Sequence, residues 1–514
     1  MTMTLSEIIT VLKDAGMFKE LIVAGKWHDR APEELANRTV LDLSYDSRTV
    51  KEGTLFFCKG LKFDPKYLTM AANQGASVAM APADYSAQLK TSEHPDLPQV
   101  IVTDIQKAMA TVSRAFFGFP DRNLTVIGYT GTKGKTTSVY FTRHVMAKAL
   151  GKVVAQLSSI DECLDGETFI PAHLTTPESL DLFRMMKEAV DNQMKYLVME
   201  VSSQSYKKSR VFGLPLDIGV FLNISPDHIS PVEHPSFEDY LACKSEIIDN
   251  CRIFVVNREC SQYDYLAEKA HDLGKQVISF GSDQSAADYQ YRLGEHGYFT
   301  VTTVTTANPA LPKLDGDFRI MMPGDFNVAN ALAALTVAAQ VAPVSEDFRA
   351  GLAETTVPGR MEFIKDKQGV VACVDYAHNY LSLTASFNFM KHEFKDGRLI
   401  VVIGAAGGKA ESRRKDIGRA LSQYADVAIL TSEDNFFEDP HQIAADIKEN
   451  IDNPDLEVIV NVDRKAAIEQ AYAMAKPGDA LFMAAKGRET FMHEKGKDVP
   501  YQGDYQITKQ LMEK

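Results

Sequence analysis

A glycine-rich segment, YTGTKGKTTS (129–138), offers the residue types that bind a phosphate group. It follows an apolar run, LTVIG (124–128), that is typical of a buried strand, and it leads into a helix predicted from about Lys135 to Leu150. Glycines allow the backbone of such a turn to point its N–H groups inward, and the helix adds the positive end of its dipole. The segment therefore predicts a polyphosphate-binding loop between a strand and a helix.

The spacing of this loop departs from the full GxxxxGK[ST] pattern, because Tyr129 stands where the first glycine would fall. Gly131 and Gly134 still permit the turn. Lys135 would then reach the β- and γ-phosphates, and Thr136 would bind Mg²⁺. A glycine-rich turn without a ligand is the alternative. The loop alone does not name a reaction, since kinases, motors, GTPases and ligases all use one.

Charged residues at the ends of the next predicted strands are candidates to complete such a site. Phosphoryl transfer needs metal ions and fixed positive charge, and open α/β sheets bind ligands at the carboxyl ends of their strands. Glu200 ends the run YLVMEV, and Asp227 and His228 follow the run DIGVFLNI. Lys244 lies on a predicted helix beyond them. Taken singly, each residue has an ordinary explanation. Asp227 fits a turn, His228 and the nearby His234 fit solvated loop histidines, and Lys244 fits a surface lysine.

The composition describes an ordinary globular protein. The chain has 514 residues, of which 45% are hydrophobic and 24% charged, with a net charge of −14. This charge disfavours non-specific nucleic-acid binding, so an anionic ligand needs a local basic site. The six cysteines form no CxxC pair and are expected to be reduced and buried. No long apolar run or secretory signal is visible, so we expect no membrane span and a cytoplasmic location.

The predicted elements divide the chain into three blocks at Pro/Gly/Asp/Asn-rich positions. These blocks span residues 1–123, 124–356 and 357–514. The second and third alternate short apolar runs with helical stretches, which predicts right-handed βαβ units and doubly wound sheets. We therefore expect an α/β protein of three domains.

Eleven motifs, in order, resemble those of the Mur ligase family, in particular its MurE type. They extend from about residue 44 to residue 504, nearly the whole chain, and together they are far more specific than any one alone. They are YDSRTVKEGTLFFCKG, TGTKGKTTS, LTTP, MEVSSQS, NISPDHISPVEHPSFEDYLACK, PGDFNVANALAA, VPGRME, VDYAHN, GAAGGKAESRRKDIG, SEDNFFEDP and AAKGRE.

This resemblance implies an N-terminal α/β UDP-binding domain, a central P-loop ATPase-like domain with a doubly wound sheet, and a C-terminal Rossmann-like domain that binds the amino acid. It implies an ATP-dependent ligase of peptidoglycan precursor synthesis, which serves cell-wall biogenesis, cell shape and cell division. The precursor UDP-N-acetylmuramoyl-L-alanyl-D-glutamate is phosphorylated to an acyl phosphate, and the α-amino group of the incoming amino acid then displaces phosphate. Closure of the third domain at a hinge near Pro358 would exclude water.

The resemblance also implies the residues of the site. ATP-facing positions correspond to Gly131, Thr132, Lys133, Gly134, Lys135, Thr136, Thr137, Asn327, Asn330, Arg360 and Asp375. Tyr45 and Ser47 correspond to positions that face the uridine of the UDP precursor. Positions that contact the UDP-muramoyl dipeptide correspond to Thr175, Thr176, Ser202 and Arg210, and Lys208 stands where the family often has a further polar contact. Two Mg²⁺ ions are expected at Thr136, Glu200, His228 and Lys244, with Lys244 carbamylated, and the catalytic group is Lys135, Glu200, His228 and Lys244.

Two residues depart from the usual pattern of the family. Lys133 replaces the asparagine of GTNGK, and Gln204 replaces the histidine of SSH. The first departure adds positive charge beside the phosphates. Its effect on rate or nucleotide choice is left open.

The segment DNFFEDP bears on the choice of amino acid. Family members that add diaminopimelate carry DNPR, whose arginine pairs with the distal carboxylate. Here Phe436 and Phe437 replace Pro-Arg, so L-lysine is favoured. The residues expected to bind it are Arg414, at the α-carboxylate, and Asp434, Asn435 and Glu489. Packing of the two phenylalanines in the core is as good an interpretation as a direct role.

Several alternatives remain open at this point. L-Ornithine is one methylene shorter than lysine, and a pocket separates such homologues by only about 1–3 kcal/mol. The same ligase acting on meso-diaminopimelate is a second alternative. A folylpolyglutamate synthetase would share the central and C-terminal domains but not the N-terminal block. A catalytically silent nucleotide-binding homologue is the fourth. We expect a monomer, with no nucleic acid as partner.

Overall fold

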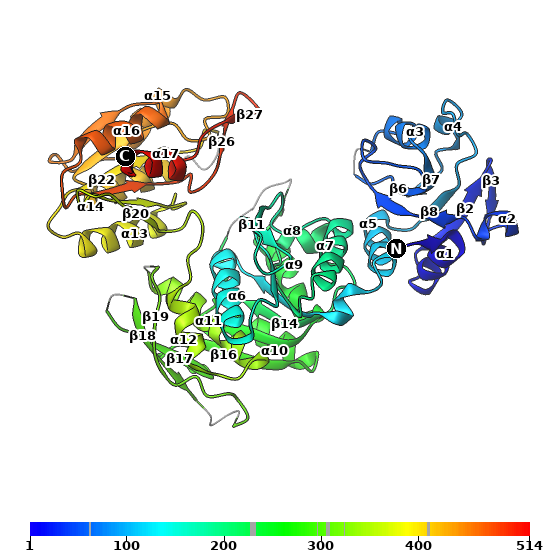
Figure 1. Ribbon diagram of the computed structural model, residues 1–514, viewed down its shortest axis with the longest axis horizontal. Helices are drawn as coiled ribbons and strands as arrows, with labels where there is room; N and C mark the ends of the chain where they lie inside the picture. The colour runs from blue at the N-terminus through cyan, green and yellow to red at the C-terminus, as the bar shows by residue number, and fades with distance from the viewer. Residues whose placement is uncertain are drawn as a thin grey trace. The chain divides into compact units, whose positions relative to one another are not determined.

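The computed structural model of the protein describes residues 1–60, 63–226, 233–295, 297–304, 309–322, 324–408 and 412–513. Figure 1 shows its helices and strands. This part of the chain forms two compact units. The first comprises Met1–Tyr291, Val301–Gly316 and Ala329–Gly351. The second comprises Arg292–Thr300, Asp317–Val328 and Leu352–Lys514. The predicted division into three domains at residues 123 and 356 stays a prediction, whereas the α/β class is confirmed.

The N-terminal sheet of the first unit has six strands in the order β3-β2-β8-β7-β6-β5. Its parallel strands are β5 (Asp42–Ser44), β6 (Thr54–Phe57), β7 (Ala76–Ala81) and β8 (Gln99–Val102), and its antiparallel strands are β2 (Phe18–Val23) and β3 (Lys26–His28). A short ladder and five helices accompany it: β1 (Met3–Thr4), β4 (Thr39–Val40), α1 (Leu5–Asp14), α2 (Glu33–Ala36), α3 (Lys66–Asn73), α4 (Ser86–Leu89) and α5 (Ile105–Phe116).

Helix α1 shows how the sequence produces these elements. Thr4 accepts a hydrogen bond from the backbone N–H of Glu7, and the Glu7 side chain accepts one from the Thr4 N–H, which is a capping box. Its apolar side chains, at helical spacing, are fully or almost fully buried: Leu5, Ile8, Ile9 and Leu12. The capping residues and the apolar spacing of the sequence therefore account for helix α1.

A second sheet has eleven strands in the order β12-β11-β10-β13-β9-β14-β15-β16-β17-β18-β19. The central three, β13 (Tyr196–Glu200), β9 (Thr125–Thr130) and β14 (Leu216–Phe221), are parallel. The others are β10 (Val154–Leu157), β11 (Asp161–Cys163), β12 (Ile170–Pro171), β15 (Cys251–Asn257), β16 (Gln276–Ser282), β17 (Tyr289–Leu293), β18 (Tyr298–Thr303) and β19 (Gly316–Arg319). The register pairs Glu200 with Tyr129 and Phe221 with Thr130, so all three strands end at one edge.

The helices of this region complete the βαβ alternation that the sequence predicts. They are η1 (Pro120–Asn123), α6 (Lys135–Leu150), α7 (Ser179–Asp191), α8 (Ser203–Lys207), α9 (Phe237–Asn250), α10 (Tyr263–Asp272), α11 (Asp325–Val341) and α12 (Glu346–Ala353). The buried apolar side chains of the central strands and of α7 and α9 form a common core.

The second unit contains a six-stranded sheet in the order β20-β21-β25-β22-β23-β24, in which only β20 is antiparallel. Its strands are β20 (Glu362–Lys365), β21 (Val371–Val374), β22 (Leu399–Ile403), β23 (Val427–Leu430), β24 (Glu457–Val460) and β25 (Ala480–Met483). Apolar clusters cover both faces. The remaining elements are α13 (Tyr380–Glu393), α14 (Ser412–Tyr424), α15 (Pro440–Lys448), α16 (Arg464–Met474), α17 (Asp504–Met512) and a hairpin of β26 (Phe491–Glu494) and β27 (Lys497–Pro500).

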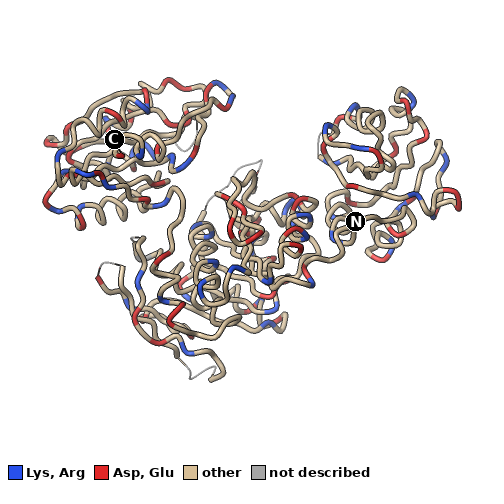
Figure 2. The backbone as a smooth tube through the Cα atoms, in the orientation of Figure 1, with Lys and Arg blue, Asp and Glu red and all other residues tan. Residues whose placement is uncertain are grey.

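The state of the cysteines agrees with the expectation from the sequence, and charged residues of both signs are spread along the chain. Figure 2 shows acidic and basic residues interspersed along the whole chain. All six cysteines are free thiols with buried side chains, as expected. Within the described ranges, every helix is too short or too polar to cross a bilayer.

Candidate functional site

The glycine loop joins β9 to α6, which is the strand–loop–helix context predicted for a phosphate loop. Gly134 precedes the first residue of α6 and has φ +87°, a conformation that favours glycine. A Cβ atom at this position would lie 2.3 Å from Oδ1 of Asn330, so the backbone approaches that side chain closely. Asn330 itself is buried, which places one predicted ATP-facing residue directly against the loop.

Hydrogen bonds to the chain after β14 hold the loop in shape. The Lys133 N–H donates to Oδ1 of Asn223, and the Asn223 side-chain amide donates back to the Lys133 carbonyl, each at 2.9 Å. The Ser225 N–H donates to the Thr132 hydroxyl at 3.1 Å. The departure at position 133 thus leaves the backbone role intact, and its side chain is exposed. Thr137 is buried at the start of α6.

Two lysine ammonium groups converge on one carbonyl of the loop. Lys135 Nζ lies 2.9 Å from the Gly131 carbonyl oxygen, and Lys244 Nζ lies 2.8 Å from the same atom. This concentration of positive charge, inside a turn whose helix presents its N-terminus, favours an anionic ligand.

Lys244 reaches the loop from the middle of α9, and it is only 2% exposed. Its ammonium group lies 4.8 Å from the centre of the Tyr240 ring, one helical turn earlier. The Tyr240 hydroxyl donates to the Thr132 hydroxyl at 3.2 Å, which ties α9 to the loop. The interpretation of Lys244 as a surface lysine is therefore wrong.

Glu200 ends β13 beside the loop and is 1% exposed. Its Oε1 atom accepts a hydrogen bond from the Thr136 hydroxyl at 2.8 Å and another from the Ser159 N–H at 2.7 Å. A carboxylate next to a hydroxyl is the oxygen-rich surrounding that Mg²⁺ prefers. The Asp227 and His228 predictions fall in 227–232, outside the described residues.

Hydrogen bonds join several residues expected to contact the precursor. The Thr176 hydroxyl donates to the Glu200 carbonyl at 3.0 Å and accepts from the Ser202 N–H at 3.1 Å. The Thr175 hydroxyl accepts from Ser159 at 3.0 Å. Arg210 donates to the Thr176 carbonyl at 3.2 Å. Lys208 lies at the end of α8 with its side chain exposed.

The N-terminal part of the first unit contributes two further predicted residues. The Tyr45 hydroxyl donates to Oδ2 of Asp181 on α7 at 2.5 Å. Burial of this phenol, with the nearby Asp181 carboxylate, raises the pKa of Tyr45 well above its ordinary value. Ser47 is 4% exposed on the same loop. Both residues follow β5, at the carboxyl end of a parallel strand.

The second unit contains the other predicted ATP-facing residues. Asp375 is buried, which raises the pKa of its carboxyl group, and it accepts hydrogen bonds from the backbone of Met361 and Ala377. The Arg360 guanidinium lies 5.0 Å from the centre of the Tyr376 ring. Asn327, on the first turn of α11, is 4% exposed.

The predicted amino-acid site, also in the second unit, contains ion pairs of its own. Arg414 is 5% exposed and donates to Glu438 at 2.6 and 2.7 Å and to Asp446 at 2.6 Å. Lys486, which the sequence did not single out, is fully buried between Asp434 at 2.9 Å and Glu489 at 2.5 Å.

The DNFFEDP segment presents a buried polar atom and an exposed aromatic ring. Asn435 is 9% exposed, and its Oδ1 atom has no hydrogen-bond partner among the described residues. Phe436 stacks on His493 with a ring-centre distance of 5.2 Å, and its φ of +52° is unusual for a non-glycine residue. Phe437 is 82% exposed, so packing in the core is wrong for this residue.

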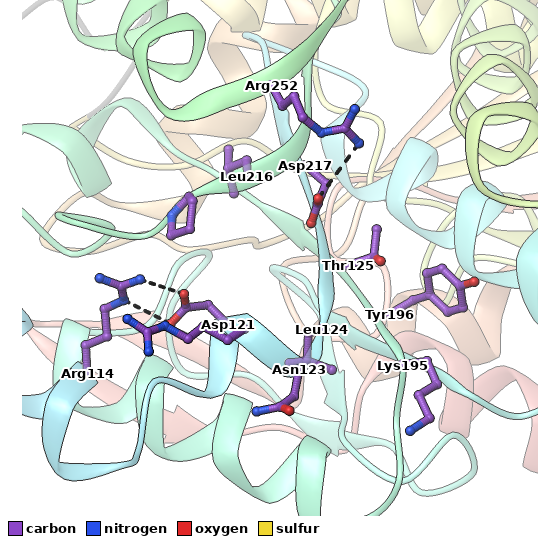
Figure 3. A pocket seen from close by; sticks show the side chains of 12 residues that line it. Arg114, Asp121, Asn123, Leu124, Thr125, Lys195, Tyr196, Leu216, Asp217 and Arg252 are labelled. Atoms are coloured by element: carbon purple, nitrogen blue, oxygen red, sulfur yellow. Dashed lines mark hydrogen bonds and ion pairs between the residues drawn. The ribbon is translucent and has the colours of Figure 1, made fainter.

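A separate groove of about 880 Å³ lies at the opposite, amino ends of the central strands (Figure 3). The first residue of β9, Thr125, lines it, whereas the phosphate loop follows the last residue of that strand. Figure 3 shows Arg114 paired with Asp121 and Arg252 with Asp217 in its wall. These charges are paired with each other, and we assign the groove no part in the reaction.

Comparison with known proteins agrees with the geometry of the site. Two family models match the chain, Mur ligase middle domain over residues 129–338 and Mur ligase, glutamate ligase domain, over residues 359–487. The UDP-N-acetylmuramoyl-L-alanyl-D-glutamate–L-lysine ligase of Enterococcus faecalis is 42% identical, with 100% of each chain covered. The enzyme of the same name from Streptococcus pneumoniae is 39% identical, with 98% of this chain and 99% of its own covered.

A solved UDP-N-acetylmuramoyl-L-alanyl-D-glutamate–2,6-diaminopimelate ligase has the same fold, with a TM-score of 0.66 and 22% identity. The matched region covers 99% of this chain and 98% of the chain of that structure. The likeness therefore extends over all the elements described above and is not limited to the phosphate loop. Together with the full-length relatives, it shows that this chain belongs to the Mur ligase family, in its MurE branch of UDP-N-acetylmuramoyl-tripeptide synthetases.

Proposed function

We propose that the protein joins L-lysine to UDP-N-acetylmuramoyl-L-alanyl-D-glutamate, with ATP as the energy source. The observation that carries the proposal is the arrangement around the loop, where Lys135, Glu200 and Lys244 meet at one edge of the sheet. The lysine ligases that match the chain over its full length support the same reaction.

The phosphate loop activates a carboxylate in this proposal. A free carboxylate is a poor electrophile, because an amine cannot displace oxide from it. Transfer of the γ-phosphoryl group of ATP to a glutamyl carboxylate oxygen forms an acyl phosphate and ADP. The α-amino group of lysine attacks the acyl carbon, loses a proton, and expels phosphate as the C–O bond breaks. No side chain of the protein needs to act as a covalent nucleophile.

The side chains act by neutralising and orienting charge. Lys135 neutralises charge on the transferring phosphoryl group, in a turn that backbone N–H groups and a helix N-terminus already make positive. Thr136 and Glu200 would hold the predicted Mg²⁺, because their oxygens suit it, and the metal would supply neutralising charge for the phosphates. Lys244 can join such a metal only as a carbamate, since an ammonium group has no lone pair to offer. Its deep position beside the loop supports that role.

The preference for lysine rests on charge. Lys486 pairs with the two carboxylates of Asp434 and Glu489, so these three side chains together carry a net negative charge. That charge suits the side-chain ammonium of lysine, whereas the distal end of diaminopimelate also carries a carboxylate. No arginine occupies the DNFFEDP segment to pair with such a group. Ornithine remains the nearest competitor, and the cytoplasmic location and monomeric state remain predictions.

One assay tests the proposal. Purified protein is given ATP, Mg²⁺, UDP-N-acetylmuramoyl-L-alanyl-D-glutamate and one amino acid at a time, and phosphate release is measured. We expect release with lysine, less with ornithine, and none with diaminopimelate. Release with diaminopimelate would refute the specificity, and no release with any amino acid would indicate a silent homologue.

A further inference from the structure

Lys59 lies at the edge of the N-terminal sheet where its parallel strands end. It follows β6, which is parallel to β5, and Tyr45 follows the end of β5. The carboxyl ends of adjacent parallel strands lie at the same edge, where open α/β sheets bind ligands. The Lys59 ammonium group lies 4.3 Å from the centre of the Tyr45 ring, so the two side chains are in contact.

Glu178 connects Lys59 to the central part of the first unit. Lys59 Nζ lies 2.5 Å from Oε2 of Glu178, and the Arg210 guanidinium donates to Oε1 of the same carboxylate at 2.9 and 3.1 Å. The side chains of all three residues are at most 17% exposed. Burial raises the pKa of Glu178, but hydrogen bonds and attraction from Lys59 and Arg210 outweigh it and lower this pKa overall. A negative charge therefore already lies between these two cations.

We infer that Lys59 binds the diphosphate of the UDP precursor, an inference that rests on the proposed function. Tyr45 is expected to face the uridine, and Arg210 is expected to contact the UDP-muramoyl dipeptide. Lys59 touches the first and shares a carboxylate with the second, so it lies within the region expected to bind this substrate. The chemical group between uridine and the muramoyl sugar is a diphosphate, which a partly buried ammonium group binds well.

Glu178 has a defined part in this arrangement. Two cations that share a buried region repel each other, and a carboxylate between them offsets that repulsion. Glu178 thereby keeps Lys59 and Arg210 close together before the substrate arrives. A purely structural ion pair between the N-terminal sheet and α7 is the alternative, and it makes different predictions for ligand binding.

The test measures binding of UDP and of uridine by calorimetry to the wild-type protein and to Lys59→Met. We expect the variant to bind UDP about 10- to 100-fold more weakly, because a charge-assisted contact to phosphate is lost, and to bind uridine as before. Lys59→Arg should restore most of the UDP affinity. Lys66→Met is the matched control, since Lys66 is 63% exposed in the same domain and should affect neither ligand.

The outcomes separate this inference from the proposed function. Equal UDP affinity in Lys59→Met and the wild type would overturn it, as would equal weakening of UDP and uridine binding or a lowered melting temperature with unchanged affinity. Because UDP binding needs neither ATP nor lysine, a failed ligase assay would leave this measurement interpretable. Weaker UDP binding by Lys59→Met, with unchanged uridine binding and an active wild-type ligase, supports the assignment.

Discussion

Nζ of Lys486 lies 2.9 Å from Oδ1 of Asp434, and both residues follow the carboxyl ends of strands in the sheet of the second unit. Lys486 is fully buried, and its ammonium group also pairs with Glu489 at 2.5 Å. The Tyr376 hydroxyl donates to Oε1 of Glu489 at 2.8 Å. The two carboxylates expected to receive the side chain of the amino acid are therefore held in place by a cation of the protein. Among the described residues, both hydrogen bonds to the Asp434 carboxylate end on Oδ1, so Oδ2 is the atom best placed to accept from a bound ammonium group.

Asp434→Asn should weaken lysine binding without affecting ATP. The change removes one negative charge that faces the incoming ammonium group, and hydrogen bonds to charged groups contribute about 1.5–3 kcal/mol. We expect the KM for lysine to rise about 10- to 100-fold while the KM for ATP stays the same. Asp498→Asn is the control, since Asp498 is 68% exposed on β27. An unchanged KM for lysine would remove Asp434 from the amino-acid site.

The same site should respond to pH through Glu433. Burial, with repulsion from Asp434 and Glu489, raises the pKa of Glu433 to about 7, against the attraction of Arg464 and Lys486. As pH rises through about 7, Glu433 ionises and the surroundings of Asp434 become more negative. Lysine should therefore bind more tightly above this pH than below it. Calorimetry at several pH values measures the effect, and Glu433→Gln should abolish the difference.

The same ionisation also affects stability. The pKa of Glu433 is higher in the folded protein than its ordinary value of 4.5, so the folded state retains a proton that the unfolded chain has already released. This contribution to the free energy of unfolding is fully present below pH 4.5 and is lost as pH rises through about 7. A Glu433→Gln variant that kept the full pH dependence of lysine binding would assign that dependence to another group.

Glu200→Gln should stop turnover while leaving the fold intact. An amide oxygen can still accept the hydrogen bonds from Thr136 and Ser159, so the local structure survives. The negative charge for the metal is lost, however, and we expect kcat to fall about 100-fold or more. Nucleotide binding, measured separately with ADP, should change much less. Glu162→Gln on β11 is the control in the same sheet, and equal loss in both variants would argue against a specific role.

The parts of the site that are continuous in sequence could be predicted, and the parts assembled by packing could not. The loop was predictable because Gly131, Gly134 and Lys135 lie within five residues and their conformational needs are local. The alternation of strands and helices likewise follows from local apolar patterns. By contrast, the burial of Lys244 depends on which face of α9 packs against the loop. Lys486 and Asp434 are 52 residues apart, and no local signal joins them.

Contacts between distant segments, and exposed apolar residues, also could not be predicted from sequence patterns. The bridge from Lys59 through Glu178 to Arg210 joins three separate segments of the chain. Phe437 is apolar like a core residue but is 82% exposed, in the wall of a hollow that Gly407, Gly408 and Glu438 also line. An exposed phenylalanine does not follow the rule that apolar residues are buried. Exceptions to this rule are expected near functional sites, and Phe437 lies in the segment predicted to bind the amino acid.

Lys244→Ala should abolish ligase turnover. The Lys244 side chain is 2% exposed, and its Nζ atom lies 2.8 Å from the Gly131 carbonyl, so truncation removes its polar group from the centre of the site. If the working form is a carbamate, the lost group is an anion that binds metal, and a small carboxylate such as acetate should restore part of the activity by filling the space. Phosphate release with and without acetate measures both effects.

Two comparisons make this prediction specific. Lys275→Ala, on the surface near α10, should be fully active and unaffected by acetate. Lys244→Arg keeps a positive charge but cannot form a carbamate, so it should be inactive if the anion is required and active if a cation suffices. Full activity of Lys244→Ala would exclude this residue from the reaction. Activity of Lys244→Arg, with no acetate rescue of Lys244→Ala, would show that the amine itself, as it bonds Gly131, is the working group.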